Sequence, residues 1–232
     1  MREALLGVAV GKKGIGKTYT TLQLISSYIK GSGSIKPRKA LILDVNDEFS
    51  SIKAISPEDV ALISHHPQVE ARRVRPFNSD GSKMTLNDVA DCLWDILKSY
   101  KGGLLLIEDI NKFTGDYFSK DLTGALCTNR HSDLDIIMHF QSIGRVGTKI
   151  FQNINWLRFH KNTDSVDRHK TKFPDKYEIF KICEILVNKQ YFNGNRYFYL
   201  TIDCDLEKIR GAFSDRMINE AIDEYLAMNF TK

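Results

Sequence analysis

The sequence predicts an α/β fold in which a mainly parallel central sheet lies between two layers of helices. Short apolar runs alternate along the chain with segments of helical spacing, which is the pattern of strand–helix–strand units. Several of these runs are apolar at every position, as expected for parallel strands buried on both faces. The last part of the chain breaks this alternation, and there we expect a β-hairpin and a final helix.

The apolar runs and the helical periods define the expected elements. The expected strands are Ala4 to Val10, Lys39 to Val45, Leu104 to Ile107, Leu134 to Phe140 and Asn153 to His160, with a short edge strand over Arg72 to Arg75. The expected helices are Tyr19 to Lys30, Leu86 to Tyr100 with Thr85 as N-cap, Ser119 to Thr128, Lys176 to Val187 and Ser214 to Met228.

A glycine-rich loop joins the first strand to the first helix. Residues 11 to 18 read Gly-Lys-Lys-Gly-Ile-Gly-Lys-Thr, a complete G-x-x-x-x-G-K-[ST] or Walker A pattern. A strand that ends in such a loop and opens a helix directs backbone N–H groups and the positive helix end at one point. Glycine allows a phosphate to approach the backbone closely. The motif therefore predicts a three-layer P-loop NTPase that binds ATP.

The side chains of the loop have distinct expected roles. Lys17 reaches the β- and γ-phosphates, and the hydroxyl of Thr18 ligates Mg²⁺. The alternative is a chance glycine-rich turn, which the strand–loop–helix context opposes. The residues expected to bind the nucleotide are Gly11, Lys12, Lys13, Gly14, Ile15, Gly16, Lys17, Thr18 and Tyr19.

Two acids follow the apolar strand that ends at Ile107. Ligands of parallel sheets bind at the carboxyl ends of the strands, so Glu108 and Asp109 are expected beside the loop. We assign Glu108 to the metal and Asp109 to activation of the attacking water, as in a Walker B motif. The usual order is Asp-Glu, so the reversal leaves open which acid activates water. The alternative is a solvated pair of acids at a strand end.

A third acidic group, Asp44 to Glu48, follows the second strand. It either contributes to the nucleotide and metal surroundings or simply forms a turn. Gln141 follows another strand, and its amide can sense a γ-phosphate. Arg130 can act as an arginine finger across a subunit interface, with Arg145 as the second candidate. The alternative for Arg130 is a surface salt bridge.

The tail of the chain carries aromatic and basic groups. Asn193-Gly194-Asn195 lies between the aromatic residues 191–192 and 197–199, which predicts a hairpin. We expect these aromatic side chains to form the hairpin core rather than a platform for bases. The residues that could contact a phosphate backbone, or lie on solvated faces, are Arg72, Arg73, Arg75 and the run 168–172.

Composition limits the remaining classes. The 232 residues include 42% hydrophobic ones and predict a single domain, with a core over about residues 1–165 and an extension over about 166–232. The net charge of +4 excludes a histone-like nucleic-acid binder. The four cysteines are widely spaced, so we expect reduced thiols and no zinc site. No membrane span or signal peptide is evident, and we expect a cytoplasmic protein.

With these motifs in place, residues of about 4 to 160 resemble the HerA/FtsK superfamily of P-loop ATPases, and within it the small viral genome-packaging ATPases. The evidence is the order of the phosphate loop, the strand at 41–49, the Glu108-Asp109 strand, Arg130-His131 and Phe140-Gln141. The resemblance implies a hexameric ring that hydrolyses ATP with Mg²⁺ and pulls DNA through its pore without sequence preference.

The same resemblance gives roles to single residues. It implies that Arg130 acts in trans and that Gln141 couples the γ-phosphate to movement. It also implies capsid or portal-vertex partners and a location in the host cytoplasm or at the virion vertex. Three alternatives stay open: an assembly or export ATPase similar to zonula-occludens-toxin proteins, which typically carry a membrane span; a small-molecule P-loop kinase; and a nucleotide-binding regulator that hydrolyses little.

Overall fold

The computed structural model describes residues 3–31, 36–115 and 118–230. The strands are β1 (Leu6–Val10), β2 (Lys39–Leu43), β3 (Ala54–Ile55), β4 (Ala71–Val74), β5 (Gly103–Ile107), β6 (Asp135–Phe140), β7 (Trp156–His160), β8 (Tyr199–Asp203) and β9 (Lys208–Gly211). The α-helices are α1 (Lys17–Lys30), α2 (Val60–His65), α3 (Leu86–Ser99), α4 (Asn111–Thr114), α5 (Lys120–Cys127), α6 (Thr148–Phe151), α7 (Tyr177–Phe192) and α8 (Asp215–Phe230). The 3-10 helices are η1 (Pro57–Asp59), η2 (Asn129–Ser132), η3 (Ile143–Arg145), η4 (Val166–Lys172) and η5 (Pro174–Lys176).

The chain forms two compact units. The first contains Met1–Gly7 and Thr18–His139, and the second contains Val8–Lys17 and Phe140–Lys232. The strands β1 and β6 therefore each contribute residues to both units. We describe the two units separately.

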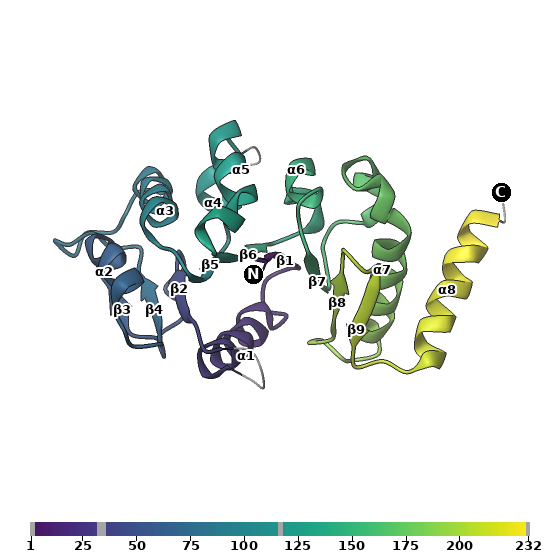
Figure 1. Ribbon diagram of the computed structural model, residues 1–232. Helices are drawn as coiled ribbons and strands as arrows, with labels where there is room; N and C mark the ends of the chain where they lie inside the picture. The colour runs from purple at the N-terminus through teal and green to yellow at the C-terminus, as the bar shows by residue number, and fades with distance from the viewer. Residues whose placement is uncertain (1–2, 32–35, 116–117, 231–232) are drawn as a thin grey trace. The chain divides into compact units, whose positions relative to one another are not determined.

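The first unit is a parallel sheet covered by helices. Its strands follow the order β3-β4-β2-β5-β6, and all their pairings are parallel. Figure 1 shows α1 on one face of β2, β5 and β6, and α3, α4 and α5 on the other. The side chains of β5 and β6 are buried throughout, as expected for parallel strands covered on both faces, although β6 includes Asp135 and His139. This confirms the predicted α/β fold with a mainly parallel sheet.

Local sequence explains where the helices of this unit begin. The side chain of Thr85 accepts a hydrogen bond from the backbone N–H of Asp88, and Asp88 accepts one from the N–H of Thr85. This capping box starts α3 at the predicted position. The hydroxyl of Ser119 accepts the N–H of Leu122 and starts α5 in the same way.

The second unit contains the predicted hairpin, but at another place. The strands β7, β8 and β9 pair antiparallel, and β8 and β9 form the hairpin. The prediction that Asn193-Gly194-Asn195 forms the turn was wrong, because α7 continues to Phe192 and the N–H of Asn193 bonds the carbonyl of Lys189 at 3.0 Å. Gly194 has a φ of 93°, so this Asn-Gly pair ends a helix instead of turning a hairpin.

The aromatic residues beside that turn are consequently not all core residues. Phe198 is 6% exposed, whereas Phe192 and Tyr197 are 76% and 68% exposed. The prediction of an aromatic hairpin core was wrong for these last two residues.

The arginines of β4 form ion pairs within the first unit. Arg73 is 8% exposed, and its NH1 lies 2.7 Å from Asp44 Oδ2 and 2.5 Å from Asp47 Oδ1. Arg75 pairs with Asp47 at 2.7 Å, and Arg72 pairs with Glu70. Each of these three arginines is thus paired with an acid of the same unit, and Arg73 is buried rather than on a solvated face. β4 also lies between β3 and β2, not at the sheet edge.

The cysteines and the helices complete this description. Cys92, Cys183 and Cys204 are buried, and no disulfide bond joins any of the four cysteines, all of which lie in the described ranges. In the described ranges, no helix has both the length and the apolar character needed to cross a membrane.

We predict that Arg73→Met destabilises the protein. The variant leaves the fully buried Asp44 without its cation, and breaking a buried ion pair costs about 3 kcal/mol. Urea unfolding monitored by circular dichroism measures this loss. Arg72→Met is the matched control and should change stability by about 1 kcal/mol or less. Equal losses in the two variants would contradict the structural role of Arg73.

We also predict an acid-dependent contribution from Asp47. Hydrogen bonds from Arg75 and Arg73 lower the pKa of Asp47 to about 2. A depressed pKa stabilises the fold above the ordinary aspartate value, so this stability is lost as the pH falls from about 4 towards 2. Asp47→Asn should flatten the dependence of the urea midpoint on pH in this window. Asp91→Asn, which removes an exposed carboxylate of α3, should retain the wild-type slope.

Candidate active site

The phosphate loop, residues 11–17, is attached to Phe140 and Lys161, two other residues of the second unit. The N–H of Gly11 donates to the carbonyl of Phe140, the last residue of β6, at 3.2 Å. The N–H of Lys12 donates to the carbonyl of Lys161, directly after β7, at 2.9 Å. These bonds fix both the start and the direction of the loop.

Glycine is required at the start of the loop. Gly11 has a φ of 152°, and a Cβ there would lie 2.7 Å from the Cβ of His160. Gly14 and Gly16 have φ values of 77° and 86°, which side-chain-bearing residues rarely adopt. The backbone thus follows the path that the motif predicts.

Lys17 is held at this loop. It is 9% exposed, and its Nζ donates to the carbonyls of Gly11 at 2.5 Å and Lys12 at 3.1 Å. The ammonium group therefore lies over the loop that carries it. From there it can exchange the carbonyl contacts for a phosphate oxygen.

His160 lies beneath the loop and was not among the predicted site residues. It has no exposed surface, and burial together with the positive charges of Arg158 and Lys17 lowers its pKa to about 3. The imidazole is therefore neutral at physiological pH and adds no second cation next to Lys17. The apolar strand pattern that predicted β7 carries no signal for this role.

The first unit brings the last residue of the motif to an acidic cluster. The hydroxyl of Thr18 lies 3.5 Å from Glu48 Oε2. Glu108 is 3% exposed, and its Oε2 has no hydrogen-bond partner among the described residues. Burial, with the negative charges of Glu48, Asp44 and Asp109, raises the pKa of Glu108 to about 8. This carboxyl group therefore holds its proton more tightly than an exposed glutamate does.

These residues fit a magnesium ion. The buried Oε2 of Glu108 accepts no hydrogen bond from the described residues, so a nearby cation would stabilise its negative charge strongly. Mg²⁺ prefers oxygen ligands and usually keeps several waters or phosphate oxygens among them. Thr18 and Glu108 are the candidate ligands, with Glu48 beside them. Within the described ranges, no three His, Cys, Asp or Glu side chains are arranged to hold a metal by themselves.

Asp109 differs from its neighbour in position. Its φ is 40°, and its Oδ2 accepts the amide of Asn46 at 3.0 Å. The Nζ of Lys112 donates in turn to Asn46 Oδ1 at 2.7 Å. This half-buried carboxylate is thus oriented by a polar chain, whereas Glu108 is buried. The sequence analysis did not identify Asn46 or Lys112 individually, because this contact joins segments more than 60 residues apart.

The acidic group after β2 divides into two parts. Asp44 accepts the backbone N–H groups of Glu48 and Phe49 and the guanidinium of Arg73, so it supports the turn. Glu48 instead lies beside Thr18. Asp44 therefore belongs to the turn, whereas Glu48 lies beside the predicted nucleotide site.

The three remaining candidates lie in 3-10 helices or directly after a strand. Arg130 belongs to η2, and its guanidinium pairs with Glu3 at 2.7 Å while 63% of the side chain is exposed. Gln141 is exposed and directly follows Phe140, whose carbonyl holds Gly11. Arg145 is exposed on η3. Gln141 is therefore next to the loop within the second unit, and Arg130 is an exposed residue of the first.

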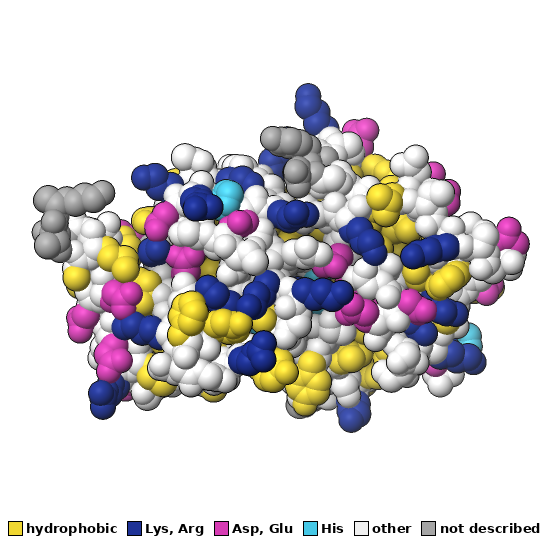
Figure 2. Space-filling view, turned by 180° about the vertical axis from the view of Figure 1, so that it is seen from behind, with side chains coloured by type: hydrophobic (Ala, Val, Ile, Leu, Met, Phe, Trp, Pro, Cys, Tyr) yellow, Lys and Arg dark blue, Asp and Glu magenta, His cyan; other side chains and the backbone are white. Residues whose placement is uncertain are grey.

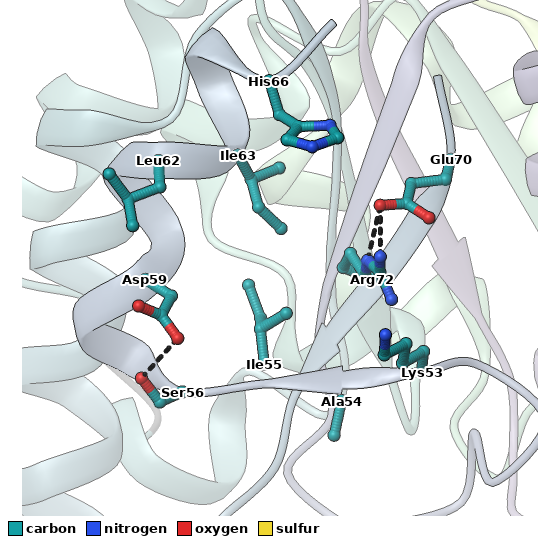
Figure 3. A pocket seen from close by; sticks show the side chains of 10 residues that line it. All are labelled: Lys53, Ala54, Ile55, Ser56, Asp59, Leu62, Ile63, His66, Glu70 and Arg72. Carbon is teal, nitrogen blue, oxygen red and sulfur yellow. Dashed lines mark hydrogen bonds and ion pairs between the residues drawn. The ribbon is translucent and has the colours of Figure 1, made fainter. Parts of the chain in front are cut away.

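A hollow of about 450 Å³ lies elsewhere in the first unit, between β3, β4 and α2 (Figure 3). Its lining side chains carry both charges, and Arg72 donates to Glu70 inside it. None of the predicted site residues lines it. The lining residues are Lys53, Ala54, Ile55, Ser56, Asp59, Leu62, Ile63, His66, Glu70 and Arg72.

Comparisons with known proteins show the fold. No family model and no curated protein sequence matches this chain. The genome-packaging NTPase B204 of Sulfolobus turreted icosahedral virus 2, in complex with AMP, is similar with a TM-score of 0.56 and 16% identity, over 91% of this chain and 98% of that one. B204 of Sulfolobus turreted icosahedral virus, a DNA-packaging ATPase, gives a TM-score of 0.58 and 16% identity over 90% and 97%.

A third structure is less similar to this chain. The N-terminal domain of zonular occludens toxin from Neisseria meningitidis has a TM-score of 0.46 and 11% identity over 94% of this chain and 98% of that one. A TM-score this low does not support the assembly-ATPase alternative. The chain thus has the fold of a P-loop NTPase, and its predicted resemblance to small viral genome-packaging ATPases is confirmed at the level of the fold.

Proposed function

We propose that this chain is an ATP-hydrolysing motor that translocates DNA, of the viral genome-packaging type, and that it works as a hexameric ring. The observation that carries the proposal is the contact of Thr18, the last residue of a complete Walker A motif, with Glu48 beside the buried Glu108. A nucleotide site of this kind supports hydrolysis as well as binding. Structures of the similar B204 protein contain AMP and ATP-gammaS, which supports a nucleotide ligand here.

The roles of the residues follow from their positions. Backbone N–H groups of the loop and the ammonium of Lys17 bind the phosphates, and Thr18 and Glu108 hold Mg²⁺. The ion would neutralise charge on the phosphate oxygens as the γ-phosphate is transferred. Asp109, oriented by Asn46, accepts a proton from the attacking water. A finger, Arg130 or in its place Arg145, stabilises the transition state from a neighbouring subunit.

A short path connects Gln141 to a basic surface within the second unit. η3 begins two residues after Gln141 and packs against η4. The Nζ of Lys172, on η4, donates to the carbonyls of Gly144 and Val146. A shift of Gln141 on loss of the γ-phosphate would therefore reach η4. The exposed basic residues of η4 are Arg168 and Lys170.

The charge distribution fits DNA contact through local patches. Figure 2 shows Lys and Arg side chains spread among acidic and hydrophobic ones on the face in view, without one continuous basic surface. A modest net charge of +4 per chain, repeated around a ring, can still neutralise several phosphates. We further propose that the ring acts in the cytoplasm of the host or at a capsid vertex.

The DNA dependence of ATP hydrolysis tests this function. A motor is stimulated by DNA of any sequence, and the stimulation falls steeply between about 50 and 200 mM salt. A small-molecule kinase ignores DNA and responds to an acceptor, and a regulator hydrolyses little under both conditions. Absence of stimulation by either single- or double-stranded DNA would contradict the proposal.

Lys17→Ala should abolish hydrolysis, because it removes the positive charge that binds the β- and γ-phosphates. Phosphate release under saturating ATP measures the effect. Lys30→Ala, at the exposed end of α1, is the control and should retain wild-type turnover. Near-normal hydrolysis by Lys17→Ala would refute the nucleotide site.

Arg130→Ala should preserve ATP binding and reduce hydrolysis by a factor on the order of 1,000 if the residue is a finger. Glu3→Ala removes the other half of the surface ion pair and should leave hydrolysis unchanged. Mixtures of Arg130→Ala and Asp109→Ala subunits should recover activity, since some interfaces then combine an intact finger with an intact acid. No recovery at any mixing ratio would argue against action in trans.

A further inference from the structure

Exposed aromatic side chains of the second unit gather at the phosphate loop. Tyr197 is 68% exposed and lies against Gly16, where a Cβ would be 3.4 Å from its Cδ1. Phe192 is 76% exposed, and the Nζ of Lys161 lies 5.3 Å from its ring centroid. Large aromatic side chains that stay exposed commonly mark binding sites.

Tyr191 attaches this aromatic group to the loop. Its hydroxyl accepts a hydrogen bond from the Nζ of Lys12 at 2.6 Å, and the same Nζ lies 4.3 Å from the ring centroid. The rings of Tyr191 and Phe192 meet edge to face at 5.6 Å. The end of α7 is thus fixed beside the loop, and it presents its neighbouring ring to solvent.

We propose that Tyr191, Phe192 and Tyr197 form the subsite for the base of the bound nucleotide, with the base stacked on Tyr197. This inference rests on the proposed nucleotide site, since the loop holds the phosphates and the base must then lie on a surface next to it. A base has two apolar faces, and an exposed tyrosine ring at the loop can cover one of them. Stacking is tolerant of base identity, so the subsite favours nucleotides over bare phosphates more than one base over another.

The contacts of the subsite also explain its geometry. Lys12 and Lys161 are joined by a backbone hydrogen bond, and each lies near one ring of the α7 end. The aromatic group is therefore positioned by the same backbone that shapes the loop. A base bound there would remain in a fixed relation to the phosphates.

The test compares ATP with inorganic tripolyphosphate, which carries the phosphates without a base. Calorimetric titrations use the full chain with Mg²⁺. Tyr197→Ala should weaken ATP binding about tenfold and leave tripolyphosphate binding unchanged, because a stacked base is worth a factor of this order. Tyr197→Phe should restore ATP affinity. Leu206→Ala, which truncates another exposed side chain of this unit, should change neither ligand.

Three results would overturn the inference. Unchanged ATP affinity in Tyr197→Ala would show that the ring does not contact the base, and an equal loss for both ligands would show that it acts on the loop. A loss confined to DNA stimulation would assign the rings to DNA instead. If the wild-type chain binds neither ligand, the proposed nucleotide site itself is contradicted. If the wild-type chain binds ATP and Tyr197→Ala binds it equally well, only the base subsite is contradicted.

Discussion

Two backbone hydrogen bonds, from Gly11 to Phe140 and from Lys12 to Lys161, hold the phosphate loop to the ends of β6 and β7. These bonds fix the positions of the first two residues of the loop. They also require Gly11, since a side chain at that position would collide with His160. The attachment places the loop next to His160, to Gln141 and to the aromatic residues that contact Lys12.

The two buried acids Asp44 and Glu108 differ in whether a partner compensates their negative charge. Asp44 has an arginine and two backbone N–H groups, so its negative charge is fully compensated inside the fold. Glu108 has no comparable partner among the described residues, and its pKa is raised to about 8. The first acid stabilises the protein, while the second is poised to gain from a cation. This contrast is why we assign a structural role to one and a metal role to the other.

The sequence predicted the elements whose signal is local. The Walker A pattern, the apolar run of β5 and the cap at Thr85 each depend on a few adjacent residues, and the structure has them in place. The Asn193-Gly194 turn was assigned wrongly because the same pair ends helices and turns hairpins, and only the packing of α7 decides between these. Arg73 was taken for a surface charge because its partners lie 26 and 29 residues away. Lys112 and His160 were missed, and Asn46 was not singled out within its acidic group, because tertiary contacts alone bring these residues to the site.

The most direct test of the account is a crystal structure of the chain with Mg²⁺ and a slowly hydrolysed ATP analogue. The account predicts the phosphates on the loop, Lys17 on the γ-phosphate, and Thr18 and Glu108 around the ion. A nucleotide bound elsewhere, or a bound nucleotide whose γ-phosphate lies far from Glu108, would contradict the proposed motor function.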